Sequence, residues 1–591
     1  MTHDFVPLDA ADLELDVAIV GAGVSGLYSG WRLLTDGAGA APSTAIFDSS
    51  ERVGGRLYSL TDIPGMPNVV GELGGMRYMK HQGIVNGLVG LLKLTPIGFP
   101  MGDVSSNLFY LRGGRFAAKQ WKDPTFSSRY FINEQDKGKT PDDMFAEIVA
   151  YVLKVNGIDP KMADTWDHKD WDAVKATLTY DRGPDKGLHL EDIGFWNLLQ
   201  DYFGAEGYAL LSEAGGYLSN TINWNSAEAL PYVIGDFGGN VTYETLAGGY
   251  DQLALGLAAE YRKAGGAIHC CSRLVRFDRN AAGAKRRYRL VIRNADDGSE
   301  RIVHADKIIL AMPRRSLELL DQDTFFFDDP AVLHNVRSVL GEPAFKLLLG
   351  FYEEGETQPW WTRWLKLTSG ESITDLPMRQ CYYFGTDPKT FHSLMLASYN
   401  DMSTVDFWKP LELPDQGRHR LRHLVTDAAR AEEFRPTATP AASMTDLEDA
   451  PYPRAPWRMV EHAMAQLRLV HGRDDIPPPY LAAFRNWNDD PFGGGYHAWK
   501  ARYSVGDVMA YMRKPLAGDD VHVCGEAYSD QQGWVEGALC VAEIMLQRHF
   551  GLRWPAPWLP TDYYLGRDPQ AIRVAHGAAA VVPASPSMPD S

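Results

Sequence analysis

A single arginine, Arg77, stands in the glycine-rich stretch GELGGMRYMK (residues 71–80) among apolar neighbours. A guanidinium presents a planar fork of N–H donors that can bind a carboxylate through two hydrogen bonds, which a lysine point charge cannot do. The alternative for a lone arginine is a surface ion pair. Arg77 follows a Gly-Gly turn, and both interpretations remain open at this point.

A dinucleotide site is predicted by GAGVSG, which matches GxGxxG at Gly21, Gly23 and Gly26. An apolar run precedes the motif and a helix-like repeat follows it, which is typical of a strand, a tight turn and a helix. The first glycine permits the turn, the second lets a pyrophosphate approach the helix N-terminus, and the third permits close helix–strand packing. Asp48 ends the next strand and would accept hydrogen bonds from a ribose.

The composition argues against several classes of partner. The chain has 58 Lys and Arg against 76 Asp and Glu, a formal charge of −18, which disfavours nucleic acid and anionic membranes. The five cysteines form no CxxC or metal-ligand spacing, so we expect no metal site and free thiols in a reducing compartment. The acidic N-terminus and the lack of a long apolar run predict neither a signal peptide nor a membrane helix. A cytoplasmic location is expected.

The segment DSSERVGGRLYSL (residues 48–60) resembles the flavin amine oxidase superfamily, whose segment at this point reads close to E-A-R-D-R-V-G-G-R. In that family the loop runs along the ribose and phosphates of FAD. Three further segments carry the same resemblance: LAGGYDQLALGLA (246–258), CSRLVRF (271–277) and VCGEAYSDQQGWVEGAL (523–539). The resemblance therefore implies that the cofactor is FAD.

The resemblance also implies which residues contact FAD. The backbone at Val275 would meet the adenine, Glu526 would bond the ribityl or ribose side, and the backbone near Val535 would meet the flavin pyrimidine. Gly495 in PFGGGY stands where monoamine oxidases carry a cysteine, so non-covalent FAD is expected. The full set of expected cofactor residues is Gly21, Gly23, Val24, Ser25, Gly26, Asp48, Glu51, Arg52, Gly55, Arg56, Gly75, Met76, Arg77, Val275, Glu526, Gly533, Trp534 and Val535.

Within the superfamily, GELGGMRYM is similar to the L-amino acid oxidase branch, where the arginine grips the substrate α-carboxylate. That role falls to Arg77, with Tyr399 of LMLASYNDMSTVDFW as a second carboxylate ligand and Trp534 as an aromatic wall over the flavin. Both aromatic residues could instead be core packing. Lys346 in GEPAFKLLLGFYEE matches the family lysine that holds a water near flavin N5, and is the predicted catalytic residue unless it is an exposed strand-end lysine.

Further pocket candidates come from segments that resemble bacterial amino-acid oxidases and 2-monooxygenases. SITDLPMRQCYYFG supplies Tyr382, and NWNDDPFGGGYHAW supplies Trp487 and Trp499. Asp236 or Glu228 could face a cationic side chain, although a solvated loop carboxylate is the more ordinary interpretation. The many aromatic residues would equally suit Phe, Tyr or Trp as substrate.

These residues are positioned by elements that are far apart in the sequence. Strand and helix patterns typical of nucleotide binding occur at the start, middle and end of the chain, and helical periodicity dominates residues 120–235. We predict a mixed α/β (α+β) fold with a discontinuous Rossmann-type FAD-binding domain, a mixed-sheet substrate domain, a helical insertion and a partly disordered tail. The FAD-binding domain is predicted to span 10–70, 245–334 and 501–555, and the substrate domain 71–119, 236–244 and 335–500. The helical insertion spans 120–235 and the tail 556–591.

The branch implies that an L-α-amino acid is oxidised at Cα by hydride transfer to flavin N5, and that oxygen is reduced to hydrogen peroxide. The products would be a 2-oxo acid and ammonia. An amino-acid 2-monooxygenase, which gives an amide with loss of CO2, shares the same site. The two remaining interpretations are a polyamine or monoamine oxidase and a catalytically silent FAD-binding protein. The expected partners are an L-amino acid, molecular oxygen and a second copy of the chain in a homodimer or higher homo-oligomer.

Overall fold

The structure is a computed structural model that describes residues 12–36, 40–123, 125–237, 241–295, 297–412 and 454–567. Part of the predicted substrate domain, residues 413–453, and the predicted tail beyond residue 567 lie outside the described residues. Within the described ranges, helices that combine the length and apolarity needed to cross a bilayer are absent.

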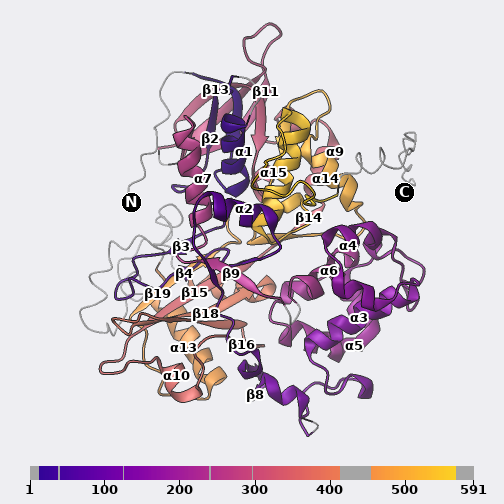
Figure 1. The fold of residues 1–591 in the computed structure, drawn as a ribbon, viewed down its shortest axis with the longest axis vertical. Helices are drawn as coiled ribbons and strands as arrows, with labels where there is room; N and C mark the ends of the chain where they lie inside the picture. Colours follow the sequence, from indigo (N-terminus) through magenta and orange to yellow (C-terminus); the bar gives the residue numbers. More distant parts are fainter. Residues whose placement is uncertain are drawn as a thin grey trace.

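A seven-stranded sheet forms the upper part of the molecule in Figure 1. Its parallel core has the strand order β10 (Ala267–His269), β2 (Thr44–Phe47), β1 (Leu13–Val20) and β13 (Glu300–Leu310), and β21 (Val521–Val523) pairs with the C-terminal end of β13. The antiparallel strands β12 (Tyr288–Asn294) and β11 (Ser272–Arg279) extend the sheet. Strands such as β2, buried at every position, read as continuous apolar runs because both faces of the sheet are covered.

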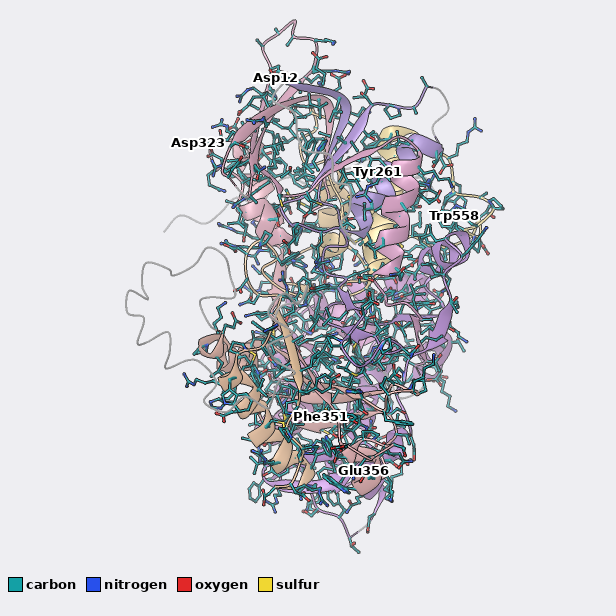
Figure 2. All side chains as sticks on the ribbon, turned by 90° about the vertical axis from the view of Figure 1, so that its left-hand side faces the viewer. Asp12, Tyr261, Asp323, Phe351, Glu356 and Trp558 are labelled. Atoms are coloured by element: carbon teal, nitrogen blue, oxygen red, sulfur yellow. The ribbon has the colours of Figure 1, made fainter. Side chains whose placement is uncertain are left out.

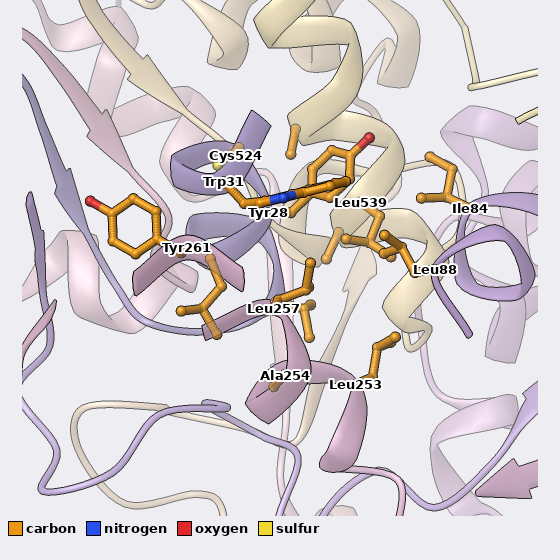
Figure 3. Packing of buried hydrophobic residues seen from close by; sticks show 14 of the residues in the cluster. Tyr28, Trp31, Ile84, Leu88, Leu253, Ala254, Leu257, Tyr261, Cys524 and Leu539 are labelled. Carbon is orange, nitrogen blue, oxygen red and sulfur yellow. The ribbon is translucent and has the colours of Figure 1, made fainter. Parts of the chain in front are cut away.

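Three helices pack together on one face of this sheet: α1 (Val24–Thr35), α7 (Gln252–Lys263) and α15 (Val535–Phe550). Figure 3 shows Tyr28 and Trp31 of α1 next to Leu253 and Leu257 of α7 in the core between the helices. The helix α1 is buried almost all round, so glycine is needed where neighbours come close: a Cβ on Gly30 would lie 2.8 Å from the ring of Tyr261.

A second seven-stranded sheet lies at the other end of the molecule. Figure 2 shows Phe351 and Glu356 at the end opposite to Asp12 and Asp323. The strand order is β19 (Leu481–Asn486), β15 (Ala344–Phe351), β18 (Ser393–Asp401), β17 (Gln380–Thr386), β16 (Glu371–Thr374), β7 (Leu108–Leu111) and β8 (Gly114–Ala117). All neighbours are antiparallel except β16 and β7. The helices α10 (Trp360–Leu365) and α13 (Trp457–His471) share a buried core with this sheet.

The helical part, at the lower right of Figure 1, contains α3 (Pro141–Val155), α4 (His168–Val174), α5 (Phe195–Ala214) and α6 (Ser226–Gly235). A capping box between Thr140 and Asp143 starts α3. A small sheet of β5 (Tyr78–Met79), β9 (Tyr243–Leu246) and β6 (Pro96–Gly98) brings the segment after Arg77 beside the segment after Asp236. The mixed α/β class predicted from the sequence is confirmed.

The chain after α15 packs back onto the protein as far as residue 567, although residues from 556 onward were expected to form a partly disordered tail. Trp558 packs near α1 and against Gly87 of α2 (Gly83–Leu91), and Figure 2 shows it on the surface of this region. The Tyr563 hydroxyl donates to Glu536 at 2.7 Å. Arg567 is buried and pairs with Asp530 and Glu228 at 2.6 and 2.8 Å.

Candidate active site

A long cavity opens where the parallel strands of the first sheet end, and residues of the segment 491–496 also line it. Many of the predicted cofactor residues line it: Gly21, Gly23, Val24, Ser25, Asp48, Gly55, Arg56, Gly75, Glu526, Gly533, Trp534 and Val535. Other lining residues come from β11 and the loops near residues 312 and 492, and include Ser272, Arg273, Leu274, Met312, Pro491, Phe492 and Tyr496. Segments separated by more than 500 residues in sequence therefore build one cavity.

The three motif glycines differ in what surrounds them. A Cβ on Gly21, whose φ is +109°, would lie 2.2 Å from the carbonyl oxygen of Ala311, and a Cβ on Gly26 would lie 1.9 Å from that of Gly21. Close backbone packing therefore requires glycine at both positions. Gly21 also lines the cavity, whereas Gly26 does not. A Cβ on Gly23 would meet no atom within 4 Å, since it would project into open space at the N-terminus of α1. That space suits a pyrophosphate.

Asp48 and Arg52 stabilise the loops that flank this space. The carboxylate of Asp48 accepts the backbone N–H groups of Ala22 at 2.6 Å and of Ser50 at 2.8 Å, and burial raises its pKa. Arg52 was expected to contact the cofactor, but its guanidinium donates to backbone carbonyls of its own loop, including Leu57 at 2.8 Å. Arg52 and the exposed Glu51 lie outside the cavity lining.

Glu526 faces the cavity with both carboxylate oxygens already bound by the protein. It accepts the N–H of Gly533 at 2.9 Å, the backbone and ring N–H of His497 at 2.8 and 2.9 Å, and an ion pair from Arg56 at 2.9 Å. Burial alone would raise the pKa of Glu526, but Arg56 and His497 outweigh it and lower the pKa to about 2. Glu526 is therefore ionised, and it connects the segment 523–539 to the loop of Arg56.

Two further expected cofactor residues do not line the cavity. Val275 lies at an irregularity in the pairing of β11, between Leu274 and Arg276, and its carbonyl accepts the N–H of Asp321. Its neighbours Ser272, Arg273 and Leu274 line the cavity in its place. Met76 is buried in a hydrophobic cluster that also contains Leu73 and Trp534.

Arg77 lies outside the cavity lining, is 8% exposed and is surrounded by aromatic rings. Its guanidinium carbon is 3.9 Å from the ring centroid of Tyr243 and 5.4 Å from that of Phe99, and one N–H contacts Met101 Sδ at 3.3 Å. Among the described residues, no carboxylate lies within 4.0 Å of its nitrogens. An arginine stays charged in proteins, and Glu371 acts on this charge from beyond that distance, without an ion pair.

Tyrosine hydroxyls gather near this guanidinium. The rings of Tyr217 and Tyr399 meet edge to face at 5.2 Å, and the hydroxyls of Tyr217 and Tyr382 are 3.4 Å apart. The hydroxyl of Tyr382 donates to Gln380 at 2.9 Å. The structure thus brings the two predicted residues Tyr382 and Tyr399 to the region of Arg77, together with Tyr217, which was not predicted from the sequence.

Lys346 is buried on β15, opposite Tyr399 in the register of β18. Its ammonium donates to the carbonyls of Gly74 at 2.6 Å and Glu72 at 3.3 Å, and it lies 4.6 Å from the ring centroid of Tyr399. Burial lowers the pKa of Lys346, and burial likewise raises the pKa of the neighbouring Glu72 carboxyl. The exposed strand-end alternative for Lys346 is therefore wrong.

Four other candidates have structural partners. The Trp487 indole donates to the carbonyl of Leu73 at 2.8 Å, and the Trp499 indole donates to Ser529 at 3.0 Å in the core of the first sheet. Neither lines the long cavity. Asp236 is buried and accepts the indole N–H of Trp534 at 2.7 Å, so it is not a solvated loop carboxylate. Glu228 is held in ion pairs with Lys175 and Arg567.

Two rings that surround Arg77, those of Tyr243 and Phe99, were not predicted from the sequence. Both reach the site because β5 and β6 flank β9, a pairing between segments about 150 residues apart in the chain. The alternation in VTYETLAGG predicts a strand at Tyr243, but no local signal shows which arginine it will face.

The chemistry of the cavity fits FAD. It combines an open cradle at Gly23, a helix N-terminus and an acidic residue at the end of the second strand, which suit a dinucleotide. Gly495 lines the cavity, and a Cβ at this position would lie 2.6 Å from that of Ala344, so the site has no room for a larger side chain. Among the described residues that line the cavity, none is a cysteine or a histidine.

Known proteins resemble this chain in sequence and in fold. A family profile described as flavin containing amine oxidoreductase matches residues 24–459. Achacin from Lissachatina fulica is 25% identical over 554 residues, which are 91% of this chain and 93% of that protein. Tryptophan 2-monooxygenase from Pseudomonas savastanoi is 24% identical over 567 residues, 89% of this chain and 87% of that protein.

An L-amino-acid oxidase from Crotalus adamanteus is 24% identical over 403 residues, 68% of each chain. Among solved structures, a double mutant of putrescine oxidase superimposes with a TM-score of 0.58 at 16% identity, and the match covers 91% of this chain and all of that one. At this identity the likeness concerns the fold alone.

Proposed function

The chain belongs to the family of flavin containing amine oxidoreductases, and from this premise we propose that it is an FAD-dependent L-amino acid oxidase. The proposed reaction converts an L-α-amino acid, water and oxygen to the 2-oxo acid, ammonia and hydrogen peroxide. When bound, FAD would accept a hydride from the substrate Cα and pass the electrons to oxygen.

The observation that carries the proposal is the buried guanidinium of Arg77. It has aromatic and sulfur neighbours but no carboxylate within 4.0 Å among the described residues. A buried charge without a hydrogen-bonded counterion is costly, and Glu371 acts on Arg77 only from beyond 4.0 Å. A substrate carboxylate would supply the counterion in a bidentate geometry. An amine substrate without a carboxylate would instead place a second positive charge beside Arg77.

The other residues of the site would orient the substrate and exclude water. Tyr399 and Tyr382 offer hydroxyls near the carboxylate position, and Trp534 forms a wall of the cavity at the end closest to Arg77. The amine of Lys346 lies between the carbonyls of Gly74 and Glu72, beside the ring of Tyr399. Such a closed polar and aromatic frame would position the reacting carbon.

The cofactor is proposed to be held without a covalent bond. The residues that would hold it are Gly21, Gly23, Asp48 and Glu526, together with the backbone around Val535. The absence of cysteine and histidine among the described lining residues supports this proposal, since these side chains could form a bond to the flavin.

The proposal is tested by a peroxide assay with a panel of common L-amino acids, their D-enantiomers, their amides and the corresponding decarboxylated amines. We expect peroxide and a 2-oxo acid only from L-amino acids with a free carboxylate. Peroxide from the amines at rates equal to those from the amino acids would contradict the proposal.

A second outcome at the same site is an amino-acid 2-monooxygenase, favoured by the 24% identity to tryptophan 2-monooxygenase over 89% of the chain. Both reactions use the same carboxylate site, so product analysis separates them. An amide and CO2, formed without an equivalent of peroxide, would establish the monooxygenase.

A further inference from the structure

Asp236 anchors two aromatic walls of the site at once. Its carboxylate accepts the indole N–H of Trp534 at 2.7 Å, and its backbone carbonyl accepts the hydroxyl of Tyr243 at 2.6 Å. The two rings lie 15° from parallel with centroids 6.3 Å apart, and Tyr243 stacks on the guanidinium of Arg77. The position of one buried residue thus determines where both rings stand.

The other side of Asp236 faces a second, smaller cavity between the helical part and the first sheet. Its lining includes His168, Lys175, Trp224 and Gln532 as well as Asp236. The indole N–H of Trp224 and the amide oxygen of Gln532 are buried without a protein partner among the described residues. A donor and an acceptor of this kind make the cavity a place for water, which gives the Asp236 carboxylate a route for proton exchange.

The charged and titratable groups around Asp236 come from every element packed against it. Lys175, the charge that acts most directly on Asp236, pairs with Asp172 at 2.5 Å and Glu228 at 2.7 Å. The remaining groups are His168 of α4, Tyr232 of α6, Asp530 before α15, and Tyr243 of β9.

Two of these groups have pKa values near neutrality, Asp236 and Asp172, and burial together with the charge of Asp530 raises the pKa of Asp172 to about 6. Burial raises the pKa of Asp236 to about 7, against the lowering effects of the Trp534 hydrogen bond and Lys175. Burial lowers the pKa of His168 to about 4, and burial raises the pKa of Tyr232 far above neutrality. The pKa of Asp530, despite its burial, is lowered by Arg567 and Lys175.

We propose that Asp236 is a positioning residue whose ionised carboxylate holds Trp534, and with it the aromatic frame around Arg77, and that protonation of Asp236 loosens this frame. The inference rests on the proposed function and adds to it a residue that controls substrate binding by pH. A hydrogen bond to an ionised acceptor is roughly twice as strong as one between neutral groups. As the pH falls from 8 to 6 the carboxylate takes up its proton, so KM for the amino acid should rise, by about fivefold, while kcat changes less.

The first test reads Trp534 without any catalysis. The holoenzyme is labelled with 5-fluorotryptophan, and the 19F resonance that disappears in Trp534→Phe identifies this side chain. We expect the resonance to shift between pH 6 and 8 in the wild type and to stay fixed in Asp236→Asn, which keeps an oxygen acceptor but cannot ionise. The same titration in both proteins, or no titration in the wild type, would overturn the proposal.

The second test compares KM and kcat across the same pH range. Ionisation of the substrate amine affects all variants alike, so the difference between variants isolates Asp236. In Asp236→Asn, KM should no longer rise as the pH falls. Asp236→Ala should raise KM about tenfold at every pH. In Trp534→Phe, the part of the pH dependence of KM that Asp236 causes should disappear. The matched control is Asp136→Asn, a buried acid paired with Lys139 in the helical part, which should keep the wild-type profile.

A wild-type KM profile in Asp236→Asn would overturn the proposal. If no L-amino acid is oxidised at all, the proposed function fails, whereas the 19F titration still decides whether Asp236 holds Trp534. The two failures are therefore distinguishable.

Discussion

At the scale of single residues, Arg77 offers the sharpest prediction. Arg77→Ala would leave a substrate carboxylate in a poorly solvated pocket without its charge partner, which typically costs about 3–5 kcal/mol. We expect kcat/KM for an L-amino acid to fall on the order of 10²- to 10³-fold, and Arg77→Lys to restore little of it. Steady-state kinetics with an amino acid and its amide measure the effect.

The control for the two Arg77 variants is the FAD content of the purified proteins. The flavin spectrum of both variants should match the wild type, because Arg77 lies outside the lining of the cofactor cavity. A variant that kept the wild-type preference for the free carboxylate over the amide would show that Arg77 serves the structure alone.

Lys346 supports a second prediction at this scale. Its buried ammonium lies between the carbonyls of Gly74 and Glu72, and the resemblance to the family implies a role in the reaction with oxygen. Lys346→Met removes the charge but keeps a long apolar side chain. We expect stopped-flow measurements to show flavin reoxidation slowed at least about tenfold, equivalent to about 1.4 kcal/mol, with a smaller effect on reduction. Equal slowing of both half-reactions would remove the assigned role.

At the scale of elements, the turn between β1 and α1 separates two kinds of glycine. A Cβ on Gly26 would collide with the Gly21 carbonyl at 1.9 Å, whereas a Cβ on Gly23 would enter open space. Gly23→Ala should therefore fold with a normal thermal midpoint but bind FAD at least about tenfold more weakly, a loss of about 1.4 kcal/mol. Gly26→Ala should lose both stability and flavin.

Calorimetry and the flavin absorbance of the purified variants test this pair. FAD retained by Gly23→Ala at wild-type affinity would mean that the pyrophosphate lies elsewhere in the cavity. The comparison is well matched because the two positions are three residues apart in the same motif.

The elements also show what the sequence could and could not predict. The glycine turn at Gly21–Gly26 and the segment 523–539 around Trp534 are local patterns, so their place in the cavity was predictable. The ring of Tyr243 over Arg77 and the bond from Asp236 to Trp534 depend on contacts between distant segments. Asp236 looked like a loop carboxylate because its burial comes from Trp534 and the helical part, which local polarity does not record.

At the scale of the whole molecule, the buried ions around Arg567 connect the end of the described chain with the helical part. Arg567 pairs with Asp530 and Glu228 and is 8% exposed. Arg567→Ala removes the closest cation from the buried Asp530 and leaves Glu228 with Lys175 alone, so the free energy of unfolding should fall by about 3–5 kcal/mol. The control is Arg293→Ala, which breaks an exposed pair with Glu300 and should cost less than about 1 kcal/mol.

Urea unfolding followed by flavin release and by circular dichroism would measure both variants. Similar losses for Arg567→Ala and Arg293→Ala would mean that the buried cluster does not hold the C-terminal segment to the helical part. FAD released on unfolding should remain in the supernatant after the polypeptide is precipitated, because the proposed attachment is non-covalent.

The cavity draws on residues from Val20 to Ala538, almost the full span of the chain. A ribosome adds about 5–20 residues per second, so a chain of 591 residues takes roughly 30 to 120 s to make. For most of that time the glycine turn exists without Glu526, Gly533 and Val535. The complete flavin site therefore exists only after Ala538 has been made, and cellular FAD supply from that moment on would set the share of chains that mature as holoenzyme.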